Sequence, residues 1–268
     1  MLGLCRFSLL VEGGFQVVHS DLQARRAMLY DPQRLASRFV WFEHLCFASL
    51  RAQTDPDFTF VVLVGTDFPD PWLNRLRDLV SDMPQVVIAS QPPGRHRDVC
   101  TASMGAFVDK QADVVGQFRL DDDDAVAVDY IARSRADFEM FEGIFRRYGL
   151  LSSNYARGLQ VTDTGTELVY EKRAATDWSC GLTLYFPSDS ETGVMDYGHH
   201  RLAEFMPTIS QNDSLMYLRG RHQSNDTRPK GQGKGEVWDA ARAKPVLLSR
   251  FGIDGDMFET ALRAARKK

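Results

Sequence analysis

Four consecutive aspartates close an apolar stretch near the middle of the chain, Val114-Val115-Gly116-Gln117-Phe118-Arg119-Leu120-Asp121-Asp122-Asp123-Asp124. Residues 114–118 are few, mostly apolar and bounded by polar residues, which is typical of a buried strand. The aspartates then follow the carboxyl end of this strand, which is where open α/β sheets bind ligands. We therefore expect the ligand site to be built around the acidic run.

The charges of the acidic run predict a cation site. The four carboxylates repel one another, and water screens this repulsion poorly at the edge of a sheet. Mg²⁺ or Mn²⁺ would relieve it, and Mg²⁺ commonly takes one or two carboxylates together with water and substrate phosphates. In an extended chain, Asp121 and Asp123 would point to one side and Asp122 and Asp124 to the other. A metal on one of these pairs is our interpretation, and a solvated acidic turn is the alternative.

Length and composition exclude several classes of protein. The 268 residues fit one large domain or two fused halves, and 44% hydrophobic with 25% charged residues is ordinary for a globular chain. A net charge of −4 and a pI near 5.9 argue against a nucleic-acid binder. No apolar stretch approaches the roughly 18–20 residues of a membrane span, and the N-terminus is a poorer signal peptide than it is a first strand. The four cysteines have neither zinc nor disulfide-framework spacing, which predicts buried free thiols in a reducing cytoplasm: Cys5, Cys46, Cys100 and Cys180.

Strand and helix patterns alternate through the first half. Asp31-Pro32 and Asp70-Pro71 are each an N-cap followed by proline, and Asp98 can cap a third helix. The expected helices lie at 31–52, from 70 and from 98, between expected strands at 6–11, 58–64, 85–89 and 114–118. This β-α-β-α-β-α-β order predicts a Rossmann-like, doubly wound and mostly parallel sheet.

The second half is less regular. We expect a helix ending at Gly149, a hairpin over 159–173, a strand over 181–186, a helix over 196–206 and a last strand over 214–219. An amphipathic pattern runs from Phe251 to the end. We divide the chain into one catalytic domain, 1–240, with a ligand-binding half (1–125) and an α+β half (126–240), and a helical tail, 241–268.

Two motifs resemble those of a known enzyme class. An acidic run after a buried strand resembles the Asp-x-Asp metal motif of GT-A glycosyltransferases. The passage Ser49-Leu50-Arg51-Ala52-Gln53-Thr54 before the strand at 58–64 resembles the helix-to-strand passage of family 2 enzymes. With Arg38, Phe42-Glu43 and Arg119–Ala125, the chain is most similar to the bacterial family labelled "putative rhamnosyltransferases", over about residues 1–225. The resemblance implies a GT-A-like fold with an acceptor-side α+β half.

The resemblance also implies a function and its binding residues. The donor would be a nucleotide-diphosphate sugar, including rhamnose, whose diphosphate is bridged by Mg²⁺ or Mn²⁺ to the acidic run. Asp121 and Asp123 would serve the metal and the donor ribose, with Asp122 replacing one of them if the register shifts by one. His222, after the last strand, would reach the metal or diphosphate, and a surface histidine is its alternative. Asp67 would contact the nucleoside base.

The catalytic base is less clearly marked. Inverting family members use a carboxylate near a helix after the acceptor-side strand, and this chain lacks the usual Glu-Asp pair there. Asp196 is the first candidate to accept the acceptor's hydroxyl proton, followed by His200 and Asp177. Trp178 could stack on a sugar or lie in the core.

Arg97 and Arg119 could bind phosphate through two parallel hydrogen bonds, or be solvated arginines at strand ends. The acceptor implied by the resemblance is a glycan or a lipid-linked molecule. The enzyme would act in the cytoplasm, including the inner face of the membrane, with at most peripheral membrane contact. The basic C-terminal tail could touch an anionic surface, or end as a solvated helix.

Two other functions are consistent with an acidic cluster. One is a phosphatase or nucleotidyltransferase, although the chain lacks an Asp-x-Asp-x-Thr motif and a Gly-rich phosphate loop. The other is a non-catalytic module that binds a nucleotide sugar without turnover.

Overall fold

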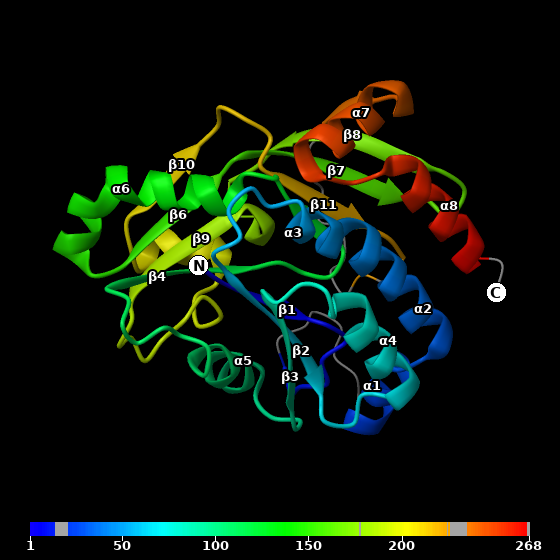
Figure 1. The fold of residues 1–268 in the computed structure, drawn as a ribbon, viewed down its shortest axis with the longest axis horizontal. Coiled ribbons are helices and arrows are strands. Elements are labelled where there is room, and N and C mark those ends of the chain that lie inside the picture. The colour runs from blue at the N-terminus through cyan, green and yellow to red at the C-terminus, as the bar shows by residue number, and fades with distance from the viewer. Residues whose placement is uncertain (14–20, 177, 224, 226–234, 267–268) are drawn as a thin grey trace.

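A seven-stranded mixed sheet forms the centre of the computed structural model, which describes residues 1–13, 21–176, 178–223, 225 and 235–266 (Figure 1). In order across the sheet, its strands are β10 (Thr208–Gln211), β6 (Leu151–Tyr155), β9 (Leu182–Pro187), β4 (Val114–Arg119), β1 (Leu2–Arg6), β2 (Thr59–Gly65) and β3 (Val86–Gln91). β3, β2, β1 and β4 are parallel neighbours, whereas β9 is antiparallel to both β4 and β6. This 3-2-1-4 order is that of a doubly wound fold, so the predicted fold class is confirmed.

Both faces of β2, in the middle of the parallel strands, are buried, because helices cover each side. On β2, Phe60, Val62 and Val64 point into one core, and Val61 and Leu63 point into the other. α2 (Pro32–Trp41) and α4 (Asp70–Val80) cover the first face, and α5 (His96–Gly105) covers the second. Continuous apolar strands of this kind are expected when a parallel sheet is covered on both sides.

The expected long helix at 31–52 is present but changes its winding. Asp31 caps α2 by accepting a hydrogen bond from the Arg34 amide at 2.8 Å, as predicted. α2 continues into a π-helical segment, η1 (Phe42–Phe47), and then into α3 (Ala48–Arg51). A short helix that the sequence did not predict, α1 (Leu22–Leu29), precedes α2.

Two boundaries near the site were predicted wrongly. β1 ends at Arg6 instead of Val11, because Ser8 takes a positive φ of 47° and turns the chain out of the sheet. α5 starts at His96, so Asp98 lies in its first turn and does not cap it. As a result, a basic residue ends β1 (Arg6) and another begins α5 (His96), both on the side of the sheet where the parallel strands end.

The second half forms a five-stranded sheet in the order β12-β8-β7-β11-β5. Its strands are β5 (Asp124–Val126), β7 (Arg157–Asp163), β8 (Leu168–Ala174), β11 (Tyr217–Arg221) and β12 (Glu236–Trp238). The predicted hairpin, formed by β7 and β8, is confirmed, as is the end of α6 (Tyr130–Tyr148) at Gly149, which has a φ of 75°. The predicted helix over 196–206 is wrong, since only a 3₁₀ segment, η3 (His199–Glu204), forms there, and a shorter one, η2 (Ser179–Gly181), precedes β9.

Two helices close the described chain, α7 (Ala240–Phe251) and α8 (Gly255–Arg266). α8 lies along α2 (Figure 1), and its buried Phe258 and Leu262 join the same core as Trp41. The four cysteines are buried and free, as predicted. No helix in the described part of the chain is both long and apolar enough to cross a membrane.

Candidate active site

The acidic run lies where the strand order of the sheet reverses. β1 and β4 are parallel neighbours, and Arg6 ends the first while Asp121–Asp124 follow the second. In doubly wound sheets the connections from such a pair lead to opposite faces, which leaves a crevice at their carboxyl ends. The predicted position of the acidic run, directly after the end of a strand of the parallel sheet, is therefore confirmed.

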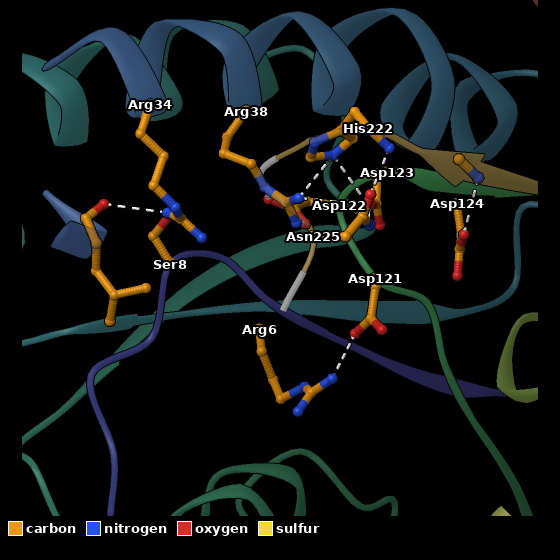
Figure 2. A network of polar contacts seen from close by, with 12 residues as sticks. Arg6, Ser8, Arg34, Arg38, Asp121, Asp122, Asp123, Asp124, His222 and Asn225 are labelled. Atoms are coloured by element: carbon orange, nitrogen blue, oxygen red, sulfur yellow. Dashed lines mark hydrogen bonds and ion pairs between the residues drawn. The ribbon is translucent and has the colours of Figure 1, made fainter. Parts of the chain in front are cut away.

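The four aspartates form a tight turn. The Asp124 amide donates a hydrogen bond to the Asp121 carbonyl at 3.0 Å, and β5 begins at Asp124. The alternating arrangement expected for an extended run is therefore wrong: Asp122 and Asp123 face one arginine, while Asp121 faces another (Figure 2). Asp122, Asp123 and Asp124 are 0%, 3% and 5% exposed, so their charges need partners within the protein.

Arg38 of α2 is the partner of the two central aspartates. Its Nε donates to Asp122 Oδ2 at 2.7 Å, a terminal nitrogen pairs with Asp122 Oδ1, and Nη1 lies 3.3 Å from Asp123 Oδ2. Burial by itself would raise the pKa of Asp123, but the Arg38 guanidinium and a hydrogen bond from His222 outweigh burial and hold this pKa below its usual range. The Asp123 carboxylate is therefore charged at neutral pH.

His222 and Asn225 approach Asp123 from the loop after β11. His222 Nε2 lies 3.1 Å from Asp123 Oδ2 and 2.9 Å from Arg38 Nη1, and the Asn225 side-chain amide donates to the same carboxylate oxygen. Burial, together with the charge of Arg38, lowers the pKa of His222 despite the nearby carboxylate. The imidazole is therefore neutral at pH 7, the form in which histidine binds metals.

Asp121 belongs to a second, more basic group. Its Oδ1 accepts from Arg6 at 2.7 Å, and Arg6 also lies 3.1 Å from His96 Nε2. Burial raises the pKa of Asp121, but the charges of Arg6 and Arg119 lower it by more. The pKa of Asp121 therefore lies below its usual value. Burial and the same two arginines lower the pKa of His96 to about 4, so this imidazole is also neutral at pH 7. The Asp121 side chain is 34% exposed, which leaves it open to a ligand in the crevice.

Asp124 faces the second sheet. Its Oδ1 accepts from the Gly220 amide at 3.1 Å, which ties the acidic turn to β11. Burial and the neighbouring Asp123 raise the pKa of Asp124 well above its usual value. Arg219, also on β11, lies 4.6 Å over the Trp178 ring.

Gly220 permits this close approach, which leads to a stability prediction. A Cβ at this position would lie 2.0 Å from the backbone oxygen of Asp123, so Gly220→Ala must push β11 away from the acidic turn. We expect the free energy of unfolding, measured by denaturant titration, to fall by about 1–3 kcal/mol. Gly143→Ala is the control: a Cβ there meets nothing within 4 Å, and alanine favours the exposed helix α6 by about 0.5–1 kcal/mol. Equal effects of the two changes would contradict the prediction.

Two groups beside the acidic turn could hold a divalent cation of the type that uses few protein ligands. Among the residues that the structure describes, no three His, Cys, Asp or Glu side chains come together closely enough to hold a metal by themselves. Asp123 Oδ2 and His222 Nε2 do lie together, however, and Mg²⁺ is commonly held by one or two protein groups plus water and substrate phosphates. The described residues therefore supply at most these two groups to a metal, and its remaining ligands would have to come from water and a bound diphosphate.

Three of the other predicted binding residues have no described contact with the acidic turn. Asp67, after β2, accepts from Tyr30 at 2.9 Å and pairs with Arg26 at 2.6 Å, so α1 covers it. Arg97 is exposed on α5. Trp178 is only 9% exposed and packs against Tyr217 at 5.4 Å, so it is mainly a core residue, with Arg219 over one face of its ring.

The candidate bases are not brought to the aspartates by any described contact. Asp196 Oδ2 accepts from Thr101 of α5 at 3.0 Å and from the Gly193 amide at 2.8 Å. These two bonds place Asp196 on the α5 side of the sheet, the side of His96. His200 is exposed on η3. Asp177 lies outside the described residues.

The sequence pattern does not predict that Arg6, Arg38, His96 and Asn225 lie around the aspartates. Arg38 carried a usable signal, because it adjoins Phe39 on the buried face of an amphipathic helix, where an arginine requires an anionic partner. Arg6, directly after an apolar strand, carried a weaker one. Nothing in the sequence pattern singles out Asn225.

One known family matches most of the chain. Residues 1–234 match the family described as "Putative rhamnosyl transferase". No curated protein matches the chain. Among solved structures, residues 1–349 of S. aureus TarS in complex with UDP-GlcNAc are 8% identical, with a TM-score of 0.44, over 98% of this chain and 70% of that one. The same protein in complex with UDP is 12% identical, with a TM-score of 0.38, over 65% of this chain.

A third solved structure is the 4-diphosphocytidyl-2C-methyl-D-erythritol synthase of Anaerococcus prevotii DSM 20548, 10% identical, with a TM-score of 0.32, over 98% of this chain and 95% of that one. The present chain spans 55% of the TarS chain solved with UDP. At these identities and TM-scores, the structural similarity supports no conclusion about this chain. The family match over residues 1–234 is what assigns the chain to a family.

Proposed function

The chain belongs to a glycosyltransferase family, the one described as "Putative rhamnosyl transferase", and from this premise we propose that it is a metal-dependent transferase of a sugar, rhamnose among the candidates, from a nucleotide-diphosphate donor. The acceptor is a glycan or a lipid-linked molecule, and transfer inverts the anomeric centre. The reaction takes place in the cytoplasm, including the inner face of the membrane, with at most peripheral membrane contact.

One observation carries this proposal: the acidic turn and a group of basic residues lie together at the carboxyl ends of β1 and β4. Asp121 and Asp123 lie with Arg6, Arg38 and His222. Breaking the anomeric C–O bond leaves a diphosphate that gains negative charge, so a site for this step must stabilise that charge with groups fixed in advance. Arginines held by buried carboxylates are fixed in this way.

Asp123 and His222 are the residues that would hold Mn²⁺ or Mg²⁺. The bound ion would supply positive charge to the departing diphosphate oxygens. Asp121, which keeps one carboxylate oxygen free of any described hydrogen bond, would accept from the donor ribose, and Asp122 would hold Arg38 in place.

The basic residues of the crevice would bind the donor. Arg119 lies at the end of β4, where burial and the charge of Arg6 lower its pKa. The buried guanidinium of Arg119 requires an anion, and a phosphate would provide one. Arg97, exposed in the first turn of α5, would also bind a donor phosphate. Asp67, held by the hydrogen bond from Tyr30, would contact the nucleoside base. Trp178 would contact the sugar.

The acceptor's hydroxyl proton requires a base, and we keep Asp196 as the first candidate, with His200 and Asp177 behind it. The two internal hydrogen bonds of Asp196 favour a second candidate function, a module that binds a nucleotide sugar without turnover. A different phosphate enzyme ranks below both.

A thermal-shift screen distinguishes these functions. UDP, GDP, dTDP and CMP are each added with Mn²⁺ or with EDTA. A ligand that binds only the folded chain stabilises it by about 2.7 kcal/mol at 100 times its Kd, so we expect one nucleoside diphosphate to raise the melting temperature, and only with Mn²⁺. A shift without turnover of the matching sugar donor would favour the binding module. No shift with any nucleotide would contradict both.

A further inference from the structure

The His222 ring is held from one side by a tryptophan. The rings of Trp41 and His222 have centroids 4.7 Å apart and an interplanar angle of 33°. Trp41 is the last residue of α2, one turn after Arg38, and it is 0% exposed. The ring that faces Asp123 on its Nε2 edge therefore rests on a rigid helical residue.

The Trp41 ring is in turn fixed from two directions. Phe258 of α8 meets it edge-on, with centroids 5.0 Å apart and an interplanar angle of 73°. From the other side, β11 passes so close that a Cβ at Gly220 would lie 2.9 Å from Trp41 Cζ3. The ring thus separates α8 from the end of β11 and sets the distance between them.

α8 is anchored by contacts that do not involve His222. Lys244 of α7 pairs with Asp256 at 2.7 Å and with Glu259 at 2.8 Å. Arg250 of α7 pairs with Asp129 at 2.9 Å and donates to the Leu215 carbonyl at 2.6 Å. The two helices are therefore tied to each other and, through Arg250, to the start of α6 and to the segment just before β11.

We infer that α8 supports the candidate site through Phe258, which holds the Trp41 ring against His222. Both α7 and α8 lie beyond residue 234, where the family match ends, so this support is a feature that the family match does not include. The inference rests on the proposed function for the role of His222, but not for the ring contacts. Phe258 and Trp41 are positioning residues, since they act through His222.

The first test is hydrogen exchange of the full chain without ligand. Phe258→Ala should speed exchange of the Gly220 and His222 amides by roughly 3- to 10-fold, the effect expected from the loss of one aromatic pair. Leu262→Ala is the matched control, because Leu262 is equally buried on the same helix and its loss leaves the ring pair intact. Equal exchange at Gly220 and His222 in both variants, or no change in either, would overturn the inference.

The second test uses Mn²⁺ alone, titrated by electron paramagnetic resonance. Loss of a group that orients a metal ligand typically costs 10- to 100-fold in metal affinity, so we expect that loss in Phe258→Ala and Trp41→Leu, wild-type affinity in Leu262→Ala, and recovery in Trp41→Phe. If the wild-type chain binds no Mn²⁺, the metal dependence under the proposed function fails, and the exchange experiment still decides the role of Phe258. If Phe258→Ala and wild type bind Mn²⁺ equally, the support does not reach the site.

Discussion

Arg38→Met should lower the free energy of unfolding at pH 7 by about 3–5 kcal/mol. The change removes the guanidinium that pairs with Asp122 and Asp123 and leaves two buried carboxylates without a cation. Breaking one side of a buried ion pair has a cost of this size, because the remaining charge stays desolvated. Denaturant titration of both proteins at pH 7 measures the difference.

The pH dependence of this difference has a definite sign. In the wild-type chain, Arg38 holds the pKa of Asp123 below its unfolded value of about 4. The ion pair therefore stabilises the fold fully above that unfolded pKa, and the stabilisation is lost as the pH falls through the folded pKa. Without Arg38, burial should raise the pKa of Asp123. As the pH falls, Asp123 in the variant is then protonated, and the free-energy cost of burying its charge disappears. We expect the gap between the two proteins to narrow from pH 7 toward pH 4.5.

Arg51→Met is the matched control. Arg51 forms an ion pair with Asp82 at 2.6 Å, but the two side chains are 50% and 60% exposed. An exposed pair contributes about 0–1 kcal/mol, so this variant should stay close to the wild type at both pH values. A similar small loss in Arg38→Met would show that the acidic turn is not charge-balanced by Arg38.

The double variant Asp121→Ala/Asp123→Ala should lose sugar transfer by at least about 10²–10³-fold, measured as nucleoside diphosphate released from the donor identified in the thermal-shift screen. The change removes one carboxylate from each of the two groups in the crevice, the one held by Arg6 and the one beside His222. Removing a single group that stabilises transition-state charge already has an effect of this size.

Two further variants separate a loss of chemistry from a loss of folding. Asp109→Ala/Asp113→Ala removes two exposed aspartates from the loop that leads into the same strand, and it should keep wild-type turnover. Asp121→Asn preserves shape at a partly exposed position, so it should remain folded while turnover falls. Retained turnover in the folded double variant would rule out the acidic turn as the reaction centre.

The sequence predicted much of the first half of the fold because its signals are local. Apolar runs, an aspartate before a proline and a glycine after a periodic stretch each act within a few residues. They therefore predicted α2, α4, β2, β4 and the end of α6 correctly. The alternation of strands and helices was enough to predict the parallel sheet and the position of the acidic run at its edge. Where a local signal was weak, as at Ser8 and over residues 196–206, the predicted element was wrong.

Only the tertiary structure decided which partners the aspartates have. Arg38 and Asp122 are 84 residues apart, Arg6 and Asp121 are 115 apart, and Arg38 and His222 are 184 apart. The helical tail expected at 241–268 is a pair of helices, of which α8 lies along α2 and reaches the site through Phe258. The sequence by itself determined where the negative charge would collect, since strand and turn propensities act between neighbours. The cost of burying that charge is met by whichever cations the whole fold brings together, and no local pattern contains that information.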